Sequence, residues 1–271
     1  MMKGLKGKNV LVTGATSGIG QAIAAYFMTE GANVALNYRN DINKLDDTKD
    51  LISEICSQGK ECPGRAVPVE ADVSQEEDIV RMCRETIDKL GSLDILINNA
   101  GIQESTPSHE LSAADFDKVM NVNLRGAYLC AREALKHFIE REYQGVIINV
   151  SSVHEIIPRP TYVSYSMSKG AMENMTKTLA LEYAPQGIRV NAIAPGATVT
   201  PINESWTEDP AKRKVVESHI PMGKVGTAME MAEITAFLAS DSASYMTGQT
   251  LFIDGGLTLY PDFIKPWSAG E

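Results

Sequence analysis

The chain contains a tyrosine and a lysine whose types and spacing are suited to proton transfer, Tyr165 and Lys169. They are four positions apart, so in a helix they share one face. A tyrosine is a weak base at neutral pH because its ordinary pKa is about 10, but a nearby ammonium group favours the phenolate. Tyr165 is therefore predicted to exchange a proton with a substrate oxygen, although this spacing alone is common on solvated helix faces.

Two polar segments provide a setting for this pair. Ser151 and Ser152 directly follow an apolar run predicted to be a strand, residues 146–150, and Ser152 precedes Tyr165 by thirteen residues. Residues 98–101, Asn-Asn-Ala-Gly, end another predicted strand at 95–98. Ligands of open α/β folds gather at the carboxyl ends of the strands. The Ser152 hydroxyl is predicted to hydrogen-bond the substrate oxygen there.

A glycine-rich turn, residues 13–20, lies between the first predicted strand and the first predicted helix. Its spacing is G-x-x-x-G-x-G, and Gly14 and Gly18 permit a close backbone approach that a Cβ would block. The N-terminus of the following helix offers free N–H groups and a positive dipole end. This turn predicts binding of a dinucleotide pyrophosphate.

Arg39 bears on which dinucleotide is bound. A carboxylate at the end of the second strand of such a fold binds the ribose of NAD, whereas arginine favours the 2′-phosphate of NADP. Here the strand ends in Leu-Asn-Tyr-Arg, and no acidic residue occurs before Asp41. NADP is therefore predicted, with NAD as an alternative that the pattern leaves open.

Apolar strands alternate with amphipathic helices throughout the chain. Strands are predicted at 9–13, 34–37, 66–69, 95–98, 146–150, 189–193 and 250–253, and helices at 19–30, 45–57, 74–90, 112–143 and 162–183. This alternation predicts a single α/β domain, residues 1–271, with a doubly wound parallel sheet. The less regular segment 195–227 is expected to be a lid, with a surface insertion as the alternative.

Composition narrows the classes of partner. The net charge of −10 disfavours nucleic acid and anionic membranes. Four cysteines without zinc spacing are expected to be free thiols in a reducing compartment, and no metal site is expected. The N-terminus lacks the apolar stretch of a signal peptide, so a cytoplasmic location is expected.

Taken together, these motifs resemble the short-chain dehydrogenase/reductase family over nearly the whole chain. The resemblance implies a Rossmann-type domain with a catalytic tetrad of Asn123, Ser152, Tyr165 and Lys169. It also implies that Asp72 contacts the adenine. The expected cofactor-binding residues are Thr13, Gly14, Ser17, Gly18, Ile19, Gly20, Arg39, Asp72, Val73, Asn99, Ala100, Gly101, Tyr165, Lys169, Pro195, Gly196, Thr198 and Thr200.

Several further segments resemble the glucose 1-dehydrogenase group of that family. They are residues 107–110, 151–158, 200–203, 220–223 and 254–261. Gln103 stands where that group is expected to have a glutamate, and Arg159 and Thr161 replace apolar residues. The resemblance implies oxidation of the C1 hydroxyl of an aldose to the lactone, in a homotetramer. The candidate sugar contacts are Ser152, Gln103, His154, Glu155 and Asn203.

Two other functions remain open from the sequence. One is the reduction of a 3-ketoacyl thioester or a steroid by the same machinery. The other is cofactor sensing without turnover, which gives no reason for the complete tetrad to be present. Trp206 and Trp267 are expected to serve packing or interfaces.

Overall fold

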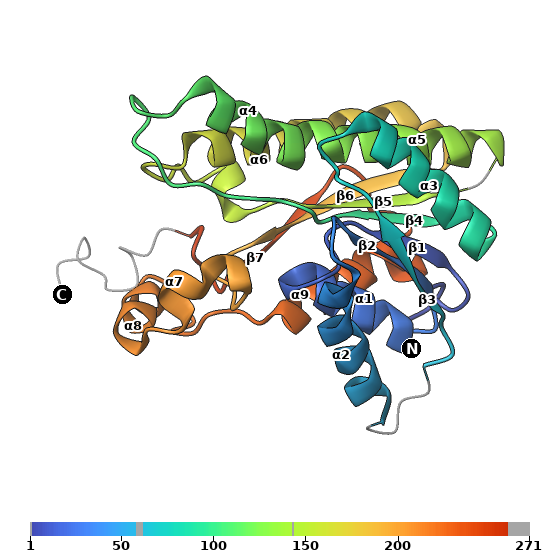
Figure 1. The fold of residues 1–271 in the computed structure, drawn as a ribbon, viewed down its shortest axis with the longest axis horizontal. Helices are drawn as coiled ribbons and strands as arrows, with labels where there is room; N and C mark the ends of the chain where they lie inside the picture. Colours follow the sequence, from blue (N-terminus) through green and yellow to red (C-terminus); the bar gives the residue numbers. More distant parts are fainter. Residues whose placement is uncertain (1, 58–61, 143, 260–271) are drawn as a thin grey trace.

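A computed structural model describes residues 2–57, 62–142 and 144–259 and shows a parallel sheet with helices on both faces (Figure 1). Its seven strands are β1 (Asn9–Val12), β2 (Asn33–Tyr38), β3 (Ala66–Glu70), β4 (Ile95–Asn98), β5 (Val146–Val150), β6 (Arg189–Pro195) and β7 (Thr250–Ile253). They are ordered β3-β2-β1-β4-β5-β6-β7, and each pair is parallel. The predicted doubly wound α/β fold is confirmed.

The two faces of the sheet belong to two apolar clusters because successive strand side chains point to opposite faces. In β1, Val10 and Val12 pack in one cluster and Leu11 in the other. In β4, Ile95 and Ile97 join the first cluster, while Leu96 joins the second. The continuous apolar runs of these strands follow from burial on both faces.

Helices cover the sheet in two layers (Figure 1). One layer holds α1 (Gly18–Thr29), α2 (Asp46–Ser57) and α9 (Ala228–Ala239); the other holds α3 (Glu76–Leu90), α4 (Ala113–Met120), α5 (Ala127–Glu140) and α6 (Val163–Tyr183). Gly31 ends α1 with a φ of +82°, as expected of a residue just past a helix. The helix α9 was not predicted; it begins at a capping box formed by Thr227 and Glu230.

The long helix predicted over 112–143 is divided into three parts. Between α4 and α5 lies a π-helical segment, η2 (Asn121–Gly126). A π segment inserts an extra residue into the turn, and such segments are frequent at functional sites. A Cβ on Gly126 would lie 2.5 Å from the carbonyl oxygen of Val73, so the segment packs closely against the loop after β3.

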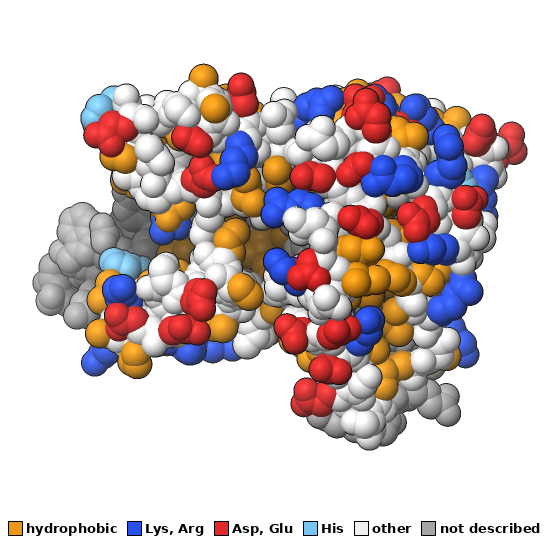
Figure 2. Space-filling model, in the orientation of Figure 1, with side chains coloured by type: hydrophobic (Ala, Val, Ile, Leu, Met, Phe, Trp, Pro, Cys, Tyr) orange, Lys and Arg blue, Asp and Glu red, His pale blue; other side chains and the backbone are white. Residues whose placement is uncertain are grey.

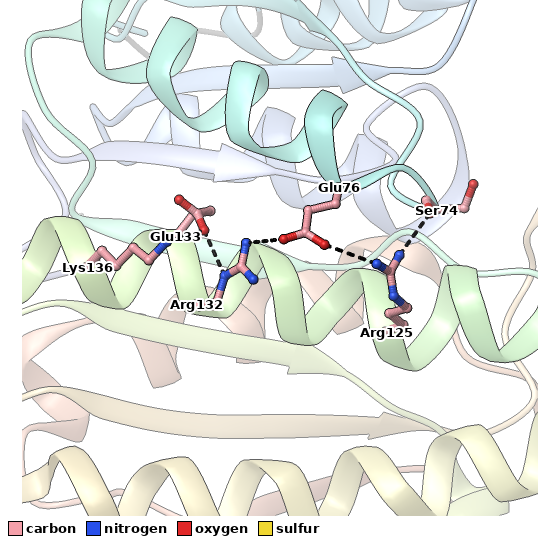
Figure 3. A network of polar contacts seen from close by, with 6 residues as sticks. All are labelled: Ser74, Glu76, Arg125, Arg132, Glu133 and Lys136. Carbon is pink, nitrogen blue, oxygen red and sulfur yellow. Dashed lines mark hydrogen bonds and ion pairs between the residues drawn. The ribbon is translucent and has the colours of Figure 1, made fainter.

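A network of charged side chains connects the start of α3 to η2 and α5 (Figure 3). Glu76 accepts from Arg125 at 3.1 Å and from Arg132 at 2.8 Å, and Arg125 also donates to the carbonyl oxygen of Ser74. These side chains are partly exposed, so each ion pair contributes only about 0–1 kcal/mol. Their combined effect is to hold the loop containing Asp72 and Val73 beside η2.

The segment 195–227 is more regular than predicted. It contains η5 (Pro201–Asn203), α7 (Glu204–Thr207) and α8 (Pro210–Ser218), which extend from one side of the sheet (Figure 1). The prolines at 201 and 210 occupy first helical turns, where their missing N–H groups cost nothing. A β-bridge between Thr198 and Gly226 closes the base of the segment.

The prediction of four free thiols is wrong for one pair. Cys56, at the end of α2, forms a disulfide with Cys62, while Cys83 and Cys130 are buried free thiols. Sequence spacing could not show that the chain returns to place Cys62 beside Cys56. No helix among the described residues is long and apolar enough to cross a membrane.

Candidate active site

A cavity of about 1130 Å³ lies at the carboxyl ends of the central strands. Its walls come from the segments that follow each of the seven strands and from the α7–α8 region. Figure 2 shows the molecule hollowed on this face, between the upper helical layer and the α7–α8 projection. The sheet topology therefore brings the predicted cofactor and catalytic segments to one place.

Tyr165 and Lys169 both line this cavity from α6. The Nζ atom of Lys169 lies 5.7 Å from the centre of the Tyr165 ring and donates a 2.7 Å hydrogen bond to the carbonyl oxygen of Val150. Burial lowers the pKa of Lys169 to about 8, and the negative charge of Glu155 opposes this effect. Burial raises the pKa of Tyr165, whereas Ser152 and Arg159 lower it.

Ser152 and His154 form the wall next to Tyr165. The Ser152 Oγ accepts a hydrogen bond from the backbone N–H of His154 at 3.2 Å and begins the 3₁₀ turn η3 (Val153–Glu155). The His154 ring meets that of Tyr165 edge-on at 6.1 Å, and its Nδ1 lies 3.0 Å from the carbonyl oxygen of Ile157. Burial lowers the pKa of His154, which favours a neutral ring with Nε2 available as an acceptor.

Asn123 is completely buried in η2 and does not line the cavity. Its amide bonds both backbone groups of Ile102, at 2.8 and 2.9 Å, and donates to Ser168 Oγ at 3.1 Å. Ser168 in turn donates to the carbonyl oxygen of Tyr165 at 2.7 Å. Asn123 thus connects the segment after β4 to the helix that carries Tyr165 and Lys169. Ser168 was not singled out from the sequence.

The glycine-rich turn has the geometry that a pyrophosphate requires. Gly14 and Gly18 adopt positive φ angles of 65° and 56° and line the cavity. The α1 helix begins at Gly18, and Ser17 at its N-cap makes no side-chain capping bond, which leaves first-turn N–H groups for a ligand. The buried Asn37, which sequence reasoning missed, accepts from the Gly14 N–H at 3.0 Å.

Thr13 and Gly20 lie behind this turn and do not line the cavity. Thr13 Oγ1 accepts from the backbone N–H groups of Asn99 and Ala100, at 2.9 and 3.0 Å. A Cβ on Gly20 would lie 2.3 Å from both Asn99 Nδ2 and the Gly14 carbonyl oxygen. These two residues therefore join the turn to the end of β4 rather than facing a ligand.

The far end of the cavity carries the residues expected at the adenosine. Asp72 and Val73 line it, and Asp72 accepts from the N–H and hydroxyl of Ser74, at 2.8 and 2.7 Å. Arg39 and Lys44 also line it, and no hydrogen bond or ion pair of either side chain occurs within the described ranges. Lys44 gave no signal in the sequence because it follows β2 by six residues.

Residues expected to contact the cofactor also follow the middle and last strands. Ile19, Asn99, Ala100 and Gly101 line the cavity, as do Pro195, Gly196, Thr198 and Thr200. A Cβ on Gly196 would lie 2.7 Å from the Asp254 Cα, so glycine permits this packing. The Thr198 hydroxyl donates to the carbonyl oxygen of Gly196 at 3.0 Å and so is occupied internally.

The candidate sugar contacts are distributed differently from the prediction. Gln103, His154 and Asn203 line the cavity, but Glu155 does not. The amide of Gln103 donates to the carbonyl oxygen of Ile202 at 3.1 Å, and that of Asn203 donates to the carbonyl oxygen of Thr198 at 2.9 Å. Their amide oxygens remain as acceptors for a substrate.

Apolar residues form much of the remaining wall, and sequence reasoning did not place them there. They include Pro158, Pro160, Ile202, Trp206, Val216, Ile220 and Leu257. The expectation that Trp206 serves packing or an interface is therefore incomplete, and Trp267 lies outside the described residues. Among the described residues, no three His, Cys, Asp or Glu side chains are grouped to hold a metal ion.

The cavity fits a nicotinamide dinucleotide. Its glycine cradle would be filled by side-chain Cβ atoms, since one on Gly14 would lie 3.0 Å from the Ala100 Cα. When bound, such a cofactor supplies or accepts the hydride of an alcohol–carbonyl interconversion. Fold and cavity together define a dinucleotide-dependent oxidoreductase.

Comparison with known proteins gives the family. A family model described as enoyl-(acyl carrier protein) reductase matches residues 14–258. The glucose 1-dehydrogenase of Gluconobacter oxydans is 49% identical over 97% of this chain and 96% of its own length. The 3β-hydroxysteroid dehydrogenase 1 of Eggerthella lenta is 48% identical over 97% of this chain and 98% of its own length. The chain belongs to the short-chain dehydrogenase/reductase family.

A solved structure supports the cofactor class. It is an Agrobacterium tumefaciens protein provisionally identified as 2-deoxy-D-gluconate 3-dehydrogenase, with bound NADP. It is 34% identical, has a TM-score of 0.83, and matches 93% of this chain and 97% of its own. The chain is accordingly a short-chain dehydrogenase/reductase that uses a nicotinamide cofactor and acts on a small molecule.

Proposed function

We propose that the protein oxidises the C1 hydroxyl of β-D-glucose or a close aldose to the lactone, with NADP as the preferred cofactor. The observation that carries this is the convergence of Ser152, Tyr165 and Lys169 on a cavity that continues to the glycine-rich turn. The 49% identity to a glucose 1-dehydrogenase supports the substrate. A cytoplasmic homotetramer is proposed from the family resemblance.

In this mechanism the Tyr165 phenolate accepts the proton from the C1 hydroxyl oxygen while a hydride leaves C1. Ser152 holds the substrate oxygen beside the phenol, and the ammonium of Lys169 stabilises the phenolate. Asn123 acts through Ile102 and Ser168, which fix the position of α6 against the cofactor segment. A bound nicotinamide would accept the hydride, so that one proton and one hydride leave the substrate together.

The polar groups that face the substrate end are consistent with a polyhydroxylated ligand. His154 Nε2 and the amide oxygens of Gln103 and Asn203 are acceptors without a hydrogen bond in the part of the chain described here. Sites that bind hydroxyls strongly disfavour analogues lacking them, by roughly 10⁴–10⁵ in the best cases. Sugars missing one hydroxyl are therefore informative probes.

A steroid or other apolar alcohol is the second candidate, favoured by the apolar wall of Ile202, Trp206, Val216, Ile220 and Leu257. The 48% identity to a 3β-hydroxysteroid dehydrogenase supports it equally well. The chain's acidic charge disfavours an acidic acyl carrier as a partner, which makes acyl-thioester reduction the weaker alternative.

The test is a substrate panel with each cofactor, followed by the absorbance of the reduced nicotinamide. Glucose, galactose, xylose and 2-deoxyglucose are compared with 3β-hydroxysteroids and ketoacyl thioesters. We expect glucose to give the highest kcat/KM and 2-deoxyglucose a lower one. Turnover of steroids alone would replace the sugar proposal with the second candidate, and no turnover of any kind would favour a cofactor sensor.

A further inference from the structure

The carboxyl group of Glu155 is buried beside the active site, near the hydroxyl groups of Ser151 and Thr250 but without a hydrogen bond of normal length and angle in the described part of the chain. Both of its oxygens, and the neighbouring Ser151 Oγ, are shielded from solvent and make no hydrogen bond within the described residues. Glu155 does not line the cavity, so substrate does not account for it. A buried polar group without a partner is costly and uncommon in native proteins, so this one calls for a function.

Glu155 lies where the catalytic serine and lysine meet. It ends the turn η3, whose first residue follows Ser152, and its backbone N–H donates to the Ser152 carbonyl oxygen at 3.0 Å. The turn packs directly against α6, because a Cβ on Gly170 would contact the Glu155 carbonyl oxygen at 3.6 Å. Gly170 follows Lys169, whose ammonium bonds the last residue of β5.

The charges around this carboxyl come from one side. Lys169, Glu173 and Lys177 face it from α6, while hydroxyl groups face it from Ser151 after β5 and Thr250 in β7. Burial raises the pKa of Glu155, Glu173 raises it further, and the two hydroxyl groups and Lys177 lower it. Burial lowers the pKa of Lys169 to about 8, and Glu155 is the negative charge that raises it.

We propose that Glu155 is a positioning residue for the reaction, whose carboxylate keeps Lys169 charged from behind the active site. The proposal rests on the catalytic roles assigned above to Tyr165 and Lys169. The pKa of Tyr165 responds to burial, Ser152 and Arg159 and not to Glu155, so we assign the effect of Glu155 on the reaction to Lys169 alone. In the alkaline range, where Lys169 releases its proton, the carboxyl is ionised and opposes that release.

The consequence is a directional change in the pH profile. Removing the carboxylate lowers the pKa of Lys169, so Lys169 becomes neutral at a lower pH and no longer stabilises the Tyr165 phenolate. In Glu155→Gln, the alkaline limb of log kcat/KM against pH should move down by roughly half a unit or more. The acid limb should stay in place, because Glu155 does not act directly on Tyr165.

Two measurements test this, with Glu173→Gln as the matched control. Glu173 faces the same carboxyl from α6 but is not among the groups that act on Lys169. The pH profile is measured with saturating cofactor. The pKa of Lys169 is measured without cofactor or turnover, by competitive acylation with acetic anhydride and mass spectrometry, because Lys169 lines the open cavity.

We expect both the acylation pKa and the alkaline limb to fall in Glu155→Gln and to stay unchanged in Glu173→Gln. Glu155→Leu is a second variant without charge that suits the buried surroundings, and it should behave like Glu155→Gln. Glu155→Asp keeps a carboxylate and should bring both values back towards those of the wild type. An unchanged acylation pKa, or equal loss of activity at every pH, would overturn the role of Glu155. A shifted acylation pKa with an unmoved limb would instead overturn the role of Lys169 in turnover.

Discussion

The two ends of the cavity are built in different ways. At the dinucleotide end, partly buried hydrogen bonds of Thr13, Asn37 and Asn99 join the first, second and fourth strands to one turn. At the substrate end, the wall is carried by η5, α7 and α8, a projection whose residues are mostly exposed. The first end is fixed by the sheet, whereas the second combines side chains of this projection with others such as Gln103 and His154, which suits a common cofactor and a variable substrate.

The largest effect on turnover should come from a change at Tyr165, which lies where the two ends of the cavity meet. Tyr165→Phe removes the phenolic oxygen from the cavity and leaves the ring that packs beside His154. We expect kcat to fall by roughly 10²–10⁴, while cofactor affinity changes little because the glycine-rich turn is untouched. Stopped-flow cofactor binding and steady-state turnover measure the two separately. A kcat within about threefold of wild type would remove Tyr165 from the proton transfer.

At the dinucleotide end, Arg39→Ala should distinguish NADP from NAD. Arg39 and Lys44 line the cavity, and only a ligand with an extra phosphate needs both cations. Loss of one charge-assisted contact should raise KM for NADP by about 10- to 100-fold and leave KM for NAD nearly unchanged. Glu70→Gln, a charge change of the opposite sign at the last residue of β3, is the control. Equal effects on both cofactors would mean that Arg39 does not contact the 2′-phosphate.

At the substrate end, Trp206→Ala should raise the KM for substrate and leave the KM for cofactor unchanged. Trp206 is partly buried and lines the cavity from α7. Losing its ring should raise substrate KM by roughly tenfold, and by more for an apolar alcohol than for an aldose. Trp206→Phe keeps an aromatic wall and should retain most affinity. If cofactor KM rose as much as substrate KM, the two ends would not be independent.

The smallest catalytic effect should come from the disulfide between Cys56 and Cys62, which closes the end of α2 outside the cavity. Non-reducing peptide mapping should detect the bond. Cys62→Ser should lower the free energy of unfolding by about 2 kcal/mol, measured by thermal melting, with both KM values unchanged. A free pair of thiols in the native protein would contradict the bond, and altered cofactor KM would place α2 in the binding function.

The sequence was most informative where local rules are strict. The strands β4 and β5 have the predicted bounds, because a buried parallel strand is a continuous apolar run, and the partly exposed edge strand β7 also has its predicted bounds. Gly31 was correctly placed after α1, since its left-handed backbone suits glycine. The segment 195–227 was mistaken for irregular because α7 and α8 are short and exposed, and they lack a long apolar stripe.

By itself, then, the sequence determined the sheet, the glycine-rich turn and the identity of the residues that could carry out proton transfer or bind the cofactor. Tertiary structure alone decided which of these share a cavity. It placed Asn123, Thr13 and Glu155 behind the wall and Trp206 and Lys44 in it. The reason is physical: propensity and periodicity act over a few residues, whereas a cavity is enclosed by side chains from separate strands and helices whose directions are set by packing.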